Sequence, residues 1–350
     1  MNNFLFSHET DTLSDEQKAA ALRHNSYELM TGLHINKHFP FIPDFLESLP
    51  EFISRPVMPP GLIDMLALFD VCVDLTLVGM IKLTLKTQQV RAELLRTIKA
   101  KASGIGDNSS DSKSVYYTVL DSPNLPAPEK TLLRLEQEGA LLVLAGTESP
   151  AKSLNTIFYH LLANPPIVSK LREELSTVSR SASWVQLERL PYLTAVIEEG
   201  HRLSFGVTAR TARIARETLT YTPTSHAIRS SNGEKSFKIP AGTPMSTTTL
   251  SAHTAPSVFP DPFVFHPERW LGDEGRKRRE YQMSFGKGSR KCLGIELARA
   301  EMYLVTAALV QGFDMALWNT KASDVAFVHD YHVSMPSMEF KGLEATVNVL

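Results

Sequence analysis

The sequence predicts a mainly helical fold with small β-sheets, of the α+β class. Long segments of helical apolar periodicity, short strand-like stretches between turn residues and the absence of internal repeats all indicate this class. The chain has 350 residues, 43% of them hydrophobic and 21% charged, which is enough for a buried core and excludes a disordered chain. Its 36 basic and 38 acidic side chains leave a formal charge of −2, so nucleic acid is not an expected partner.

The first half of the chain is predicted to be helical. Before residue 100, helices are expected on both sides of a proline-marked segment at residues 40–60. Residues 102–114, rich in Ser, Gly and Asp, predict a mobile loop. A helix of roughly 30 residues is expected over 131–163. Gly146 and Pro150 lie near its middle, and we expect a local kink there because proline removes the hydrogen bond to the Gly146 carbonyl.

The second half alternates helices with short strands. An irregular, proline-rich stretch at 259–270 separates the strands from a glycine-rich loop. The apolar patterns and proline positions predict three helices and four strand-like segments. The helices are expected over 166–178, from Pro191 through Leu203, and over 293–312. The strands are expected over 217–221, 237–239 and 245–250, and 340–350 is expected to be a strand or hairpin arm.

The sharpest local feature is the sequence F-G-K-G-S-R-K-C-L-G at residues 285–294. It places the Cys292 thiol on a glycine-shaped loop just before a helix, where backbone N–H groups favour a thiolate that could serve as nucleophile or metal ligand. The other cysteine, Cys72, is far away in sequence, so the two predict neither a disulfide framework nor a zinc cage. A lone cysteine is normally a small buried hydrophobe, but Gly288 and Gly294 favour close approach of a flat ligand.

A second feature is an acid and a base on one face of a predicted helix. Glu199 and Arg202 lie three residues apart, which lets their side chains meet. The same spacing recurs at 93–96 and 296–299, which we interpret as solvated ion pairs. A later P-E-R-W segment at 267–270 supplies another arginine in a proline-rich context.

A third feature, A-G-T-E-S, lies in the long predicted helix at residues 145–149. With the cysteine loop, the E-x-x-R pair and the P-E-R-W segment, it resembles the cytochrome P450 family, in particular fungal members of secondary metabolism similar to the trichodiene-oxygenase-like group. The resemblance covers most of the chain and implies the cytochrome P450 fold over residues 1–350. It identifies residues 285–294 as the haem-thiolate loop.

The resemblance also implies roles for individual residues. Cys292 would be the axial thiolate ligand of haem b, which favours O–O cleavage. Glu199, Arg202 and Arg269 would form a buried structural triad beside the cysteine loop. The remaining residues belong to two sets, one for oxygen activation and one for haem binding. For oxygen activation, Gly146 would leave room for O₂, and Glu148 and Ser149 would relay protons, with serine in place of the usual threonine. For haem binding, Arg213 and Arg290 would bind the propionates. Three further residues, Phe285, Gly288 and Gly294, would shape the loop.

The implied activity is insertion of one oxygen atom from O₂ into a lipophilic small molecule, a terpenoid or polyketide type of fungal metabolite. Electrons would come from NADPH through NADPH–cytochrome P450 reductase, with cytochrome b5 as a further donor. Substrate contacts are expected from residues 204–208, the start of the oxygen segment at 145–149 and the C-terminal hairpin within 340–350. The basic run 276–279, with Lys287 and Lys291, is either a docking surface for the reductase, a nuclear-localisation-like patch or a solvated basic loop.

Family members are about half as long again, and the segment before the oxygen helix is shorter here by more than about a hundred residues. We therefore expect an N-terminally truncated version of the fold, without the membrane anchor, the first sheet strands and the W-x-x-x-R helix. The resemblance implies the cytosolic face of the endoplasmic reticulum, yet no uncharged apolar run in this chain is long enough to span a bilayer. Two alternatives stay open: an isomerase or dehydratase that does not use O₂, and a non-enzymatic remnant.

Overall fold

The computed structural model describes residues 92, 94–99, 115–222, 236–337 and 342–350. The predicted loop at 102–114 and almost all of the helices expected before residue 100 lie outside these ranges. Within them the fold is mainly helical with small antiparallel sheets, which confirms the predicted class. The α-helices are α7 (Val115–Asp121), α8 (Leu132–Leu162), α9 (Pro165–Leu175), α10 (Trp184–Leu187), α11 (Pro191–Ser204), α12 (Thr249–His253), α13 (Gly272–Arg278), α14 (Ile295–Gly312) and α15 (Ala322–Val325).

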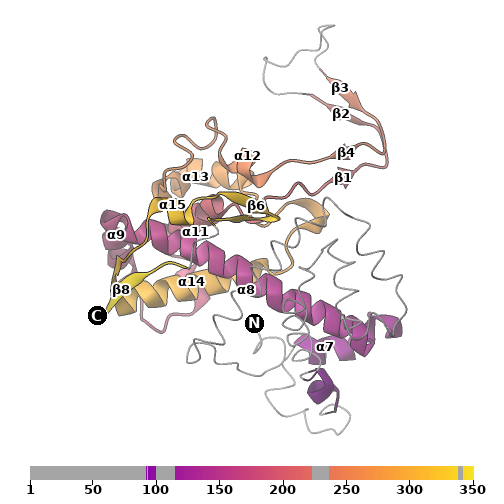
Figure 1. The fold of residues 1–350 in the computed structure, drawn as a ribbon, viewed down its shortest axis with the longest axis horizontal. Coiled ribbons are helices and arrows are strands. Elements are labelled where there is room, and N and C mark those ends of the chain that lie inside the picture. The colour runs from indigo at the N-terminus through magenta and orange to yellow at the C-terminus, as the bar shows by residue number, and fades with distance from the viewer. Residues whose placement is uncertain (1–91, 93, 100–114, 223–235, 338–341) are drawn as a thin grey trace.

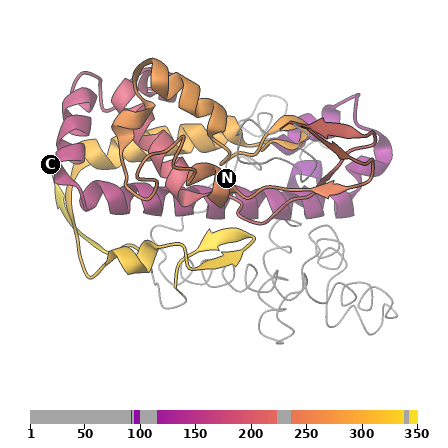
Figure 2. The same ribbon diagram turned by 90° about the horizontal axis from the view of Figure 1, so that it is seen from above.

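Helix α8 is the long axis around which the other elements are arranged (Figure 1). It starts after Thr131, whose hydroxyl accepts a hydrogen bond from the Arg134 backbone N–H at 3.4 Å, and it continues through Pro150 to Leu162. The prediction of one helix over 131–163 is thus confirmed. Figure 2 shows α13 and α14 on one side of α8 and the C-terminal helix α15 with strands β6 and β7 on the other.

Helix α11 is the most deeply buried element of the described chain. Pro191 occupies its first turn, where the missing N–H has no helical partner to lose, and the chain leaves the helix at Phe205 in a left-handed conformation (φ 60°). Eleven of its fourteen residues are buried. At Gly200 an added Cβ would collide with the Ile157 side chain of α8, so glycine permits the close contact of the two helices.

The main hydrophobic core lies between α8, α9, α11 and α14. Apolar residues three and four apart on each helix, such as Leu193 and Val196 on α11, turn one stripe inward, as the apolar patterns predicted. Burial of such side chains contributes about 1.5–3 kcal/mol each. The fully or nearly fully buried members are Ile157, Leu161, Leu171, Leu175, Leu187, Leu193, Val196, Ile197, Met302, Tyr303 and Val310.

The strands form four two-stranded antiparallel sheets, in which β1 pairs with β4, β2 with β3, β5 with β8 and β6 with β7. The predicted strands at 217–221 and 237–239 are confirmed as β2 and β3, and the C-terminal strand as β8, which pairs with β5 directly after α14. The strands are β1 (Arg213–Ile214), β2 (Leu219–Tyr221), β3 (Phe237–Ile239), β4 (Pro244–Met245), β5 (Phe313–Leu317), β6 (His329–Tyr331), β7 (Val333–Met335) and β8 (Ala345–Val349).

The prediction of a strand over 245–250 is wrong. Strand β4 ends at Met245 and helix α12 begins at Thr249, because the Thr248 hydroxyl caps the helix by accepting a hydrogen bond from the Ser251 N–H at 3.1 Å. The β-branched run T-T-T predicted a strand, but threonine is also a good N-cap residue. In the described part of the chain no helix is both long and apolar enough to cross a membrane.

Candidate functional site

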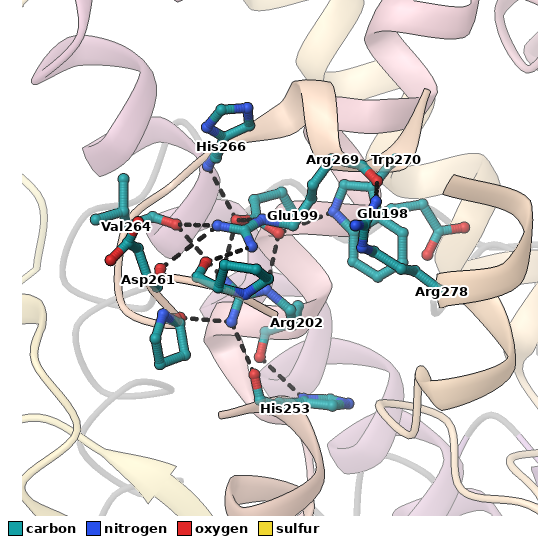
Figure 3. Close-up of polar contacts among 12 residues, drawn as sticks. Glu198, Glu199, Arg202, His253, Asp261, Val264, His266, Arg269, Trp270 and Arg278 are labelled. Atoms are coloured by element: carbon teal, nitrogen blue, oxygen red, sulfur yellow. Dashed lines mark hydrogen bonds and ion pairs between the residues drawn. The ribbon is translucent and has the colours of Figure 1, made fainter. Parts of the chain in front are cut away.

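A buried ion cluster lies at the C-terminal end of α11 (Figure 3). The Glu199 carboxylate accepts two hydrogen bonds from Arg202, from Nε to Oε2 and from Nη2 to Oε1, both at 2.8 Å. Arg269 of the 3₁₀ helix η3 (Pro267–Trp270) donates from Nε to Glu199 Oε1 at 3.0 Å. The Glu199 and Arg202 side chains are 0% exposed, so the structure brings the three expected residues together away from solvent.

Two further donors complete the hydrogen bonding of the Glu199 carboxylate. Trp270 Nε1 donates to Glu199 Oε2 at 2.8 Å, and the backbone N–H of His266 donates to Oε1 at 2.9 Å. The two arginines direct their other N–H groups at backbone carbonyls of the 253–264 segment. These bonds run from Arg202 Nη1 to His253 O (2.9 Å) and Pro262 O (2.5 Å), and from Arg269 Nη1 to Pro260 O (2.8 Å) and Nη2 to Val264 O (3.2 Å).

This cluster is structural in its chemistry. Burying charges costs several kcal/mol per ion unless each is paired and hydrogen-bonded, and here one carboxylate faces two guanidinium groups whose excess charge is distributed over carbonyl oxygens. The proline-rich segment has the backbone conformation that turns those carbonyls toward the arginines. Sequence reasoning found the three charged residues but missed Trp270 and the His266 amide, although Trp270 stands directly beside Arg269.

The cysteine loop approaches helix α14 through two residues with positive φ, Gly286 (67°) and Gly288 (79°), a region that side-chain-bearing residues rarely adopt. The Cys292 backbone N–H donates to the Phe285 carbonyl at 2.8 Å, which closes the loop. Cys292 is exposed and carries a free thiol. Gly294 is the N-cap of α14, so the thiol lies just ahead of the helix N-terminus, as the sequence predicted.

The loop is joined to α11 by Phe285 and its neighbour. The Phe285 ring packs edge-on against His201, with ring centroids 5.0 Å apart, and the Ser284 hydroxyl donates to the His201 carbonyl at 2.7 Å. His201 is fully buried, and desolvation lowers its pKa to about 4, so its ring is neutral at neutral pH. The cysteine loop and the ion cluster are therefore attached to the same turn of the same helix.

The residues around the thiol fit a flat, anionic group. An added Cβ at Gly288 or at Gly294 meets nothing within 4 Å, so the surface before both is open; the positive φ of Gly288 requires glycine there, whereas neither packing nor a positive φ explains Gly294. Arg290, in the 3₁₀ turn η5 (Gly288–Arg290), and Arg213, on β1, are both exposed, and neither pairs with a carboxylate among the described residues. Arg290 precedes Cys292 by two residues on the loop, whereas Arg213 lies on β1 and its Nη1 donates to the Thr211 and Ala212 carbonyls at 3.4 and 3.1 Å. A thiolate and guanidinium groups are the residue types that would hold an iron porphyrin with two propionates.

The predicted oxygen segment lies inside α8. The Thr147 hydroxyl turns back to the Val143 carbonyl at 2.6 Å and is thereby occupied, whereas Ser149 is exposed. Pro150 has no N–H, so the Gly146 carbonyl lacks its usual helical donor. The segment thus combines an exposed hydroxyl with a backbone acceptor that the helix itself does not satisfy, next to Glu148.

Sequence reasoning missed a polar junction one turn further along α8. Lys152 Nζ donates to the hydroxyl of Ser334 on β7, which donates to the Ser204 carbonyl at the end of α11 at 2.8 Å. Burial lowers the pKa of Lys152 to about 7, against a nearby Asp330 charge that raises it. These contacts join α8, α11 and the β6–β7 hairpin, and no signal in the local sequence around Lys152 pointed to them.

Two interpretations of charged residues are wrong. Arg299 does not form a solvated pair with Glu296; its guanidinium lies 3.5 Å from Glu188 and 3.7 Å from Glu198, on neighbouring helices. The basic run 276–279 is not a loop. It forms the end of α13 and the start of the turn η4 (Arg279–Tyr281), because the acidic first turn of α13 stabilises a short helix.

The basic run divides into two halves. Arg276 and Lys277 are exposed and pair with Asp273 and Glu274 within α13. Arg278 and Arg279 instead point inward, where their guanidinium groups donate to the carbonyls of Arg269 (2.9 Å) and Trp270 (3.3 Å). The first half is therefore exposed, whereas Arg278 and Arg279 are half-buried and are bonded to backbone carbonyls.

The fold and the site define a class of protein: a mainly helical chain with one thiol on a glycine loop, fixed beside a buried Glu–Arg–Arg cluster. Comparison with known proteins gives the family. The cytochrome P450 family profile matches residues 65–339, and the chain belongs to the cytochrome P450 family. Its relatives are enzymes of fungal secondary metabolism, which confirms the resemblance predicted from the motifs.

Three relatives illustrate the range. The chain is 34% identical over 310 residues to cytochrome P450 monooxygenase TRI4 of Trichoderma arundinaceum, which covers 87% of this chain and 53% of the relative. It is 40% identical over 232 residues to monooxygenase astB of Aspergillus terreus, covering 64% and 43%. It is 35% identical over 272 residues to N-acetyltryptophan 6-hydroxylase ivoC of Emericella nidulans, covering 75% and 50%. The chain spans about half the length of these relatives.

Proposed function

We propose that the protein is a haem-thiolate monooxygenase that inserts one oxygen atom of O₂ into a lipophilic small molecule of fungal secondary metabolism. The observation that carries the proposal is the exposed Cys292 thiol on its glycine loop, just ahead of α14, with open space at Gly288 and Gly294. In the overall reaction one oxygen atom enters a C–H bond of the substrate and the other leaves as water. NADPH supplies the two electrons and one hydrogen, and a solvent proton completes the water.

Haem b is the cofactor of this proposal. When bound through the Cys292 thiolate it supplies the oxidising chemistry, because the thiolate favours O–O cleavage. Gly288 and Gly294 keep side chains off the surface on which the porphyrin would lie, and Phe285 fixes the loop against α11. Arg290 and Arg213 would hold the propionates by charge-assisted hydrogen bonds.

The oxygen segment supplies protons. The Ser149 hydroxyl would donate a proton on the side of α8 where the Gly146 carbonyl is left without its helical donor, and the Glu148 carboxyl would restore that proton from solvent. Threonine holds its hydroxyl by a second branch on Cβ, whereas serine rotates freely. A serine at this position therefore favours a looser hydroxyl orientation.

Electrons would arrive from NADPH–cytochrome P450 reductase, with cytochrome b5 as a further donor, at the face that carries the cysteine loop. The exposed cations on the loop are Lys287 and Lys291, and Arg276 and Lys277 on α13, which pair with Asp273 and Glu274, precede the loop in sequence. Such a group suits an acidic partner because complementary charge accelerates association. The proposed location is the cytosolic face of the endoplasmic reticulum, where the reductase of the family resides.

Oxygen uptake tests the proposal. The chain, expressed with haem supply, is mixed with NADPH and the reductase, and uptake is followed with N-acetyltryptophan as one lipophilic probe and ¹⁸O₂ as the oxygen source. The proposal predicts NADPH-dependent uptake that Cys292→Ala abolishes and a product that carries one labelled oxygen. Conversion of a probe without NADPH and O₂ supports the isomerase or dehydratase alternative, and failure to retain haem supports the non-enzymatic remnant.

A further inference from the structure

His253, the last residue of α12, joins the ion cluster to the cysteine loop. Its side chain is 0% exposed and lies beside Arg202 in Figure 3. Its Nδ1 atom is 2.9 Å from the backbone carbonyl oxygen of Arg202, and its Nε2 atom is 2.9 Å from the backbone nitrogen of Met283. Its own carbonyl accepts a hydrogen bond from Arg202 Nη1 at 2.9 Å.

The partners determine the state of the ring. The Met283 N–H can only donate, so Nε2 accepts, and the Arg202 carbonyl can only accept, so Nδ1 carries the hydrogen. The neutral ring in this one tautomer satisfies both bonds. Burial lowers the pKa of His253 to about 4, which is consistent with a ring that is neutral when the protein is folded.

Met283 stands at the point where the chain turns toward the cysteine. The next residues, Ser284 and Phe285, are attached to His201 on α11, and the Phe285 carbonyl accepts the hydrogen bond from the Cys292 N–H. Of these attachments only the Met283 bond reaches the helix α12. The His253 imidazole therefore links the Arg202 backbone to the segment before the cysteine loop by way of α12, in addition to the direct contacts that Gln282, Ser284 and Phe285 make with α11.

We propose that His253 is a positioning residue for the Cys292 loop. Its Nε2 accepts a hydrogen bond from the Met283 N–H and so fixes the backbone just before the loop. Its Nδ1–H donates to the Arg202 carbonyl and so ties that backbone to the buried ion cluster. The effect of His253 on the position of the loop does not depend on bound haem. Its effect on the iron–thiolate bond rests on the proposed function.

Hydrogen exchange and the ferrous–CO spectrum test this role in the full chain expressed with haem supply. His253→Phe retains a buried ring and removes both hydrogen bonds, whereas His253→Gln retains an N–H donor and an oxygen acceptor. His329→Phe, on the β6–β7 hairpin, is the matched control because it removes an imidazole that stacks on Tyr331, outside the loop. The peptide covering residues 165–175 reports on the rest of the fold.

The role predicts that His253→Phe speeds exchange in peptides covering 282–292 about fivefold, with no change in 165–175. His253→Gln and His329→Phe should retain slow exchange in both peptides. In the CO spectrum, His253→Phe should lose part of the red-shifted thiolate band and His253→Gln should recover it. Unchanged exchange over 282–292 in His253→Phe, or equal acceleration everywhere in both His253 variants, would overturn the role.

A second variant covers the case in which His253→Phe does not fold. Met283→Pro deletes the N–H donor from the other side, and Gln282 before it has the extended backbone (φ −68°, ψ 124°) that a following proline requires. The role predicts faster exchange over 282–292 in Met283→Pro with no change in 165–175, and unchanged exchange over 282–292 would overturn it. Where His253→Phe folds, adding it to Met283→Pro should bring no further increase, because both remove the same bond. Additive effects would overturn it. A chain that binds no haem contradicts the proposed function, while the exchange comparison still decides the role of His253.

Discussion

Two Glu-x-x-Arg patterns in this chain have the same spacing and opposite outcomes. On α11, Glu199 and Arg202 pair within one helical turn at 2.8 Å and are 0% exposed. On α14, Arg299 does not pair with Glu296 and instead contacts Glu188 and Glu198 on other helices, with 32% of its side chain exposed. Spacing makes a pair possible; the surrounding backbone decides whether it forms.

The surroundings differ in their supply of acceptors. Around Arg202 the proline-rich segment at 253–264 presents backbone carbonyls that are not used by secondary structure. The buried guanidinium therefore finds a hydrogen-bond acceptor for each of its N–H groups. Around Arg299 the chain is helical, and the guanidinium lies near two carboxylates, that of the partly exposed Glu188 and that of the buried Glu198. An irregular segment beside a helix is thus what converts a common surface pattern into a buried one.

The largest expected effect comes from Glu199→Gln. It leaves Arg202 and Arg269 buried without an anion and should lower the free energy of unfolding by about 3–5 kcal/mol, a large share of typical stability. Urea unfolding measures it. The matched change Glu296→Gln should stay within about 0.5 kcal/mol, and equal losses from both would refute the contrast between the two helices.

Trp270→Phe tests whether the Glu199 carboxylate needs the indole N–H donor in the buried cluster. The ring remains packed near Phe259, but the Glu199 carboxylate loses the Nε1–H donor at 2.8 Å. A hydrogen bond to a charged group contributes about 1.5–3 kcal/mol, and the urea midpoint should fall accordingly. An unchanged midpoint would show that the carboxylate does not need its fifth donor.

Acid should lower the free energy of unfolding through two buried neutral histidines, His201 on α11 and His253 on α12. Burial lowers the pKa of both His201 and His253 to about 4, below the ordinary value of about 6.5. Between these values the unfolded chain binds more protons than the folded one, so stability is present above pH 6.5 and falls toward pH 4. Each histidine should contribute on the order of 1 kcal/mol of loss at pH 5, seen as a lower urea midpoint than at pH 7. His253→Gln should flatten this dependence, and a steeper one would contradict the assignment.

The smallest effect is expected at Arg299. Because its side chain is one third exposed and its carboxylate distances are 3.5 and 3.7 Å, Arg299→Met should cost about 0.5–1 kcal/mol, and less at high salt. Lys277→Ala, which removes an exposed pair with Glu274, is the control and should change little. A salt-independent loss above about 3 kcal/mol at Arg299 would mean that α14 carries a second buried cluster.

The sequence predicted what depends on local pattern and on motifs. The boundaries of α8, α11 and α14, and the meeting of Glu199, Arg202 and Arg269, follow from apolar periodicity, proline placement and the family motifs. The strand expected over 245–250 failed because a threonine run serves a cap as well as a strand.

What the sequence did not predict depends on distant partners. His253 contacts Met283, which is thirty residues away in sequence, and Lys152 contacts Ser334, which is 182 residues away. Arg299 lies near Glu188, at the end of α10, and Glu198, on α11. Each is a single polar residue whose local surroundings suit several roles. Only the packing of separate helices and loops selects among them.

The most direct test of the central claim is the ferrous–CO difference spectrum of the full chain, with Cys292→Ala and Cys72→Ser compared under the same haem supply. Ligation by Cys292 predicts a red-shifted thiolate band in the unsubstituted chain that persists in Cys72→Ser and disappears in Cys292→Ala. Bound haem without that band, or a band that survives in Cys292→Ala, would contradict the assignment of Cys292 as the ligand.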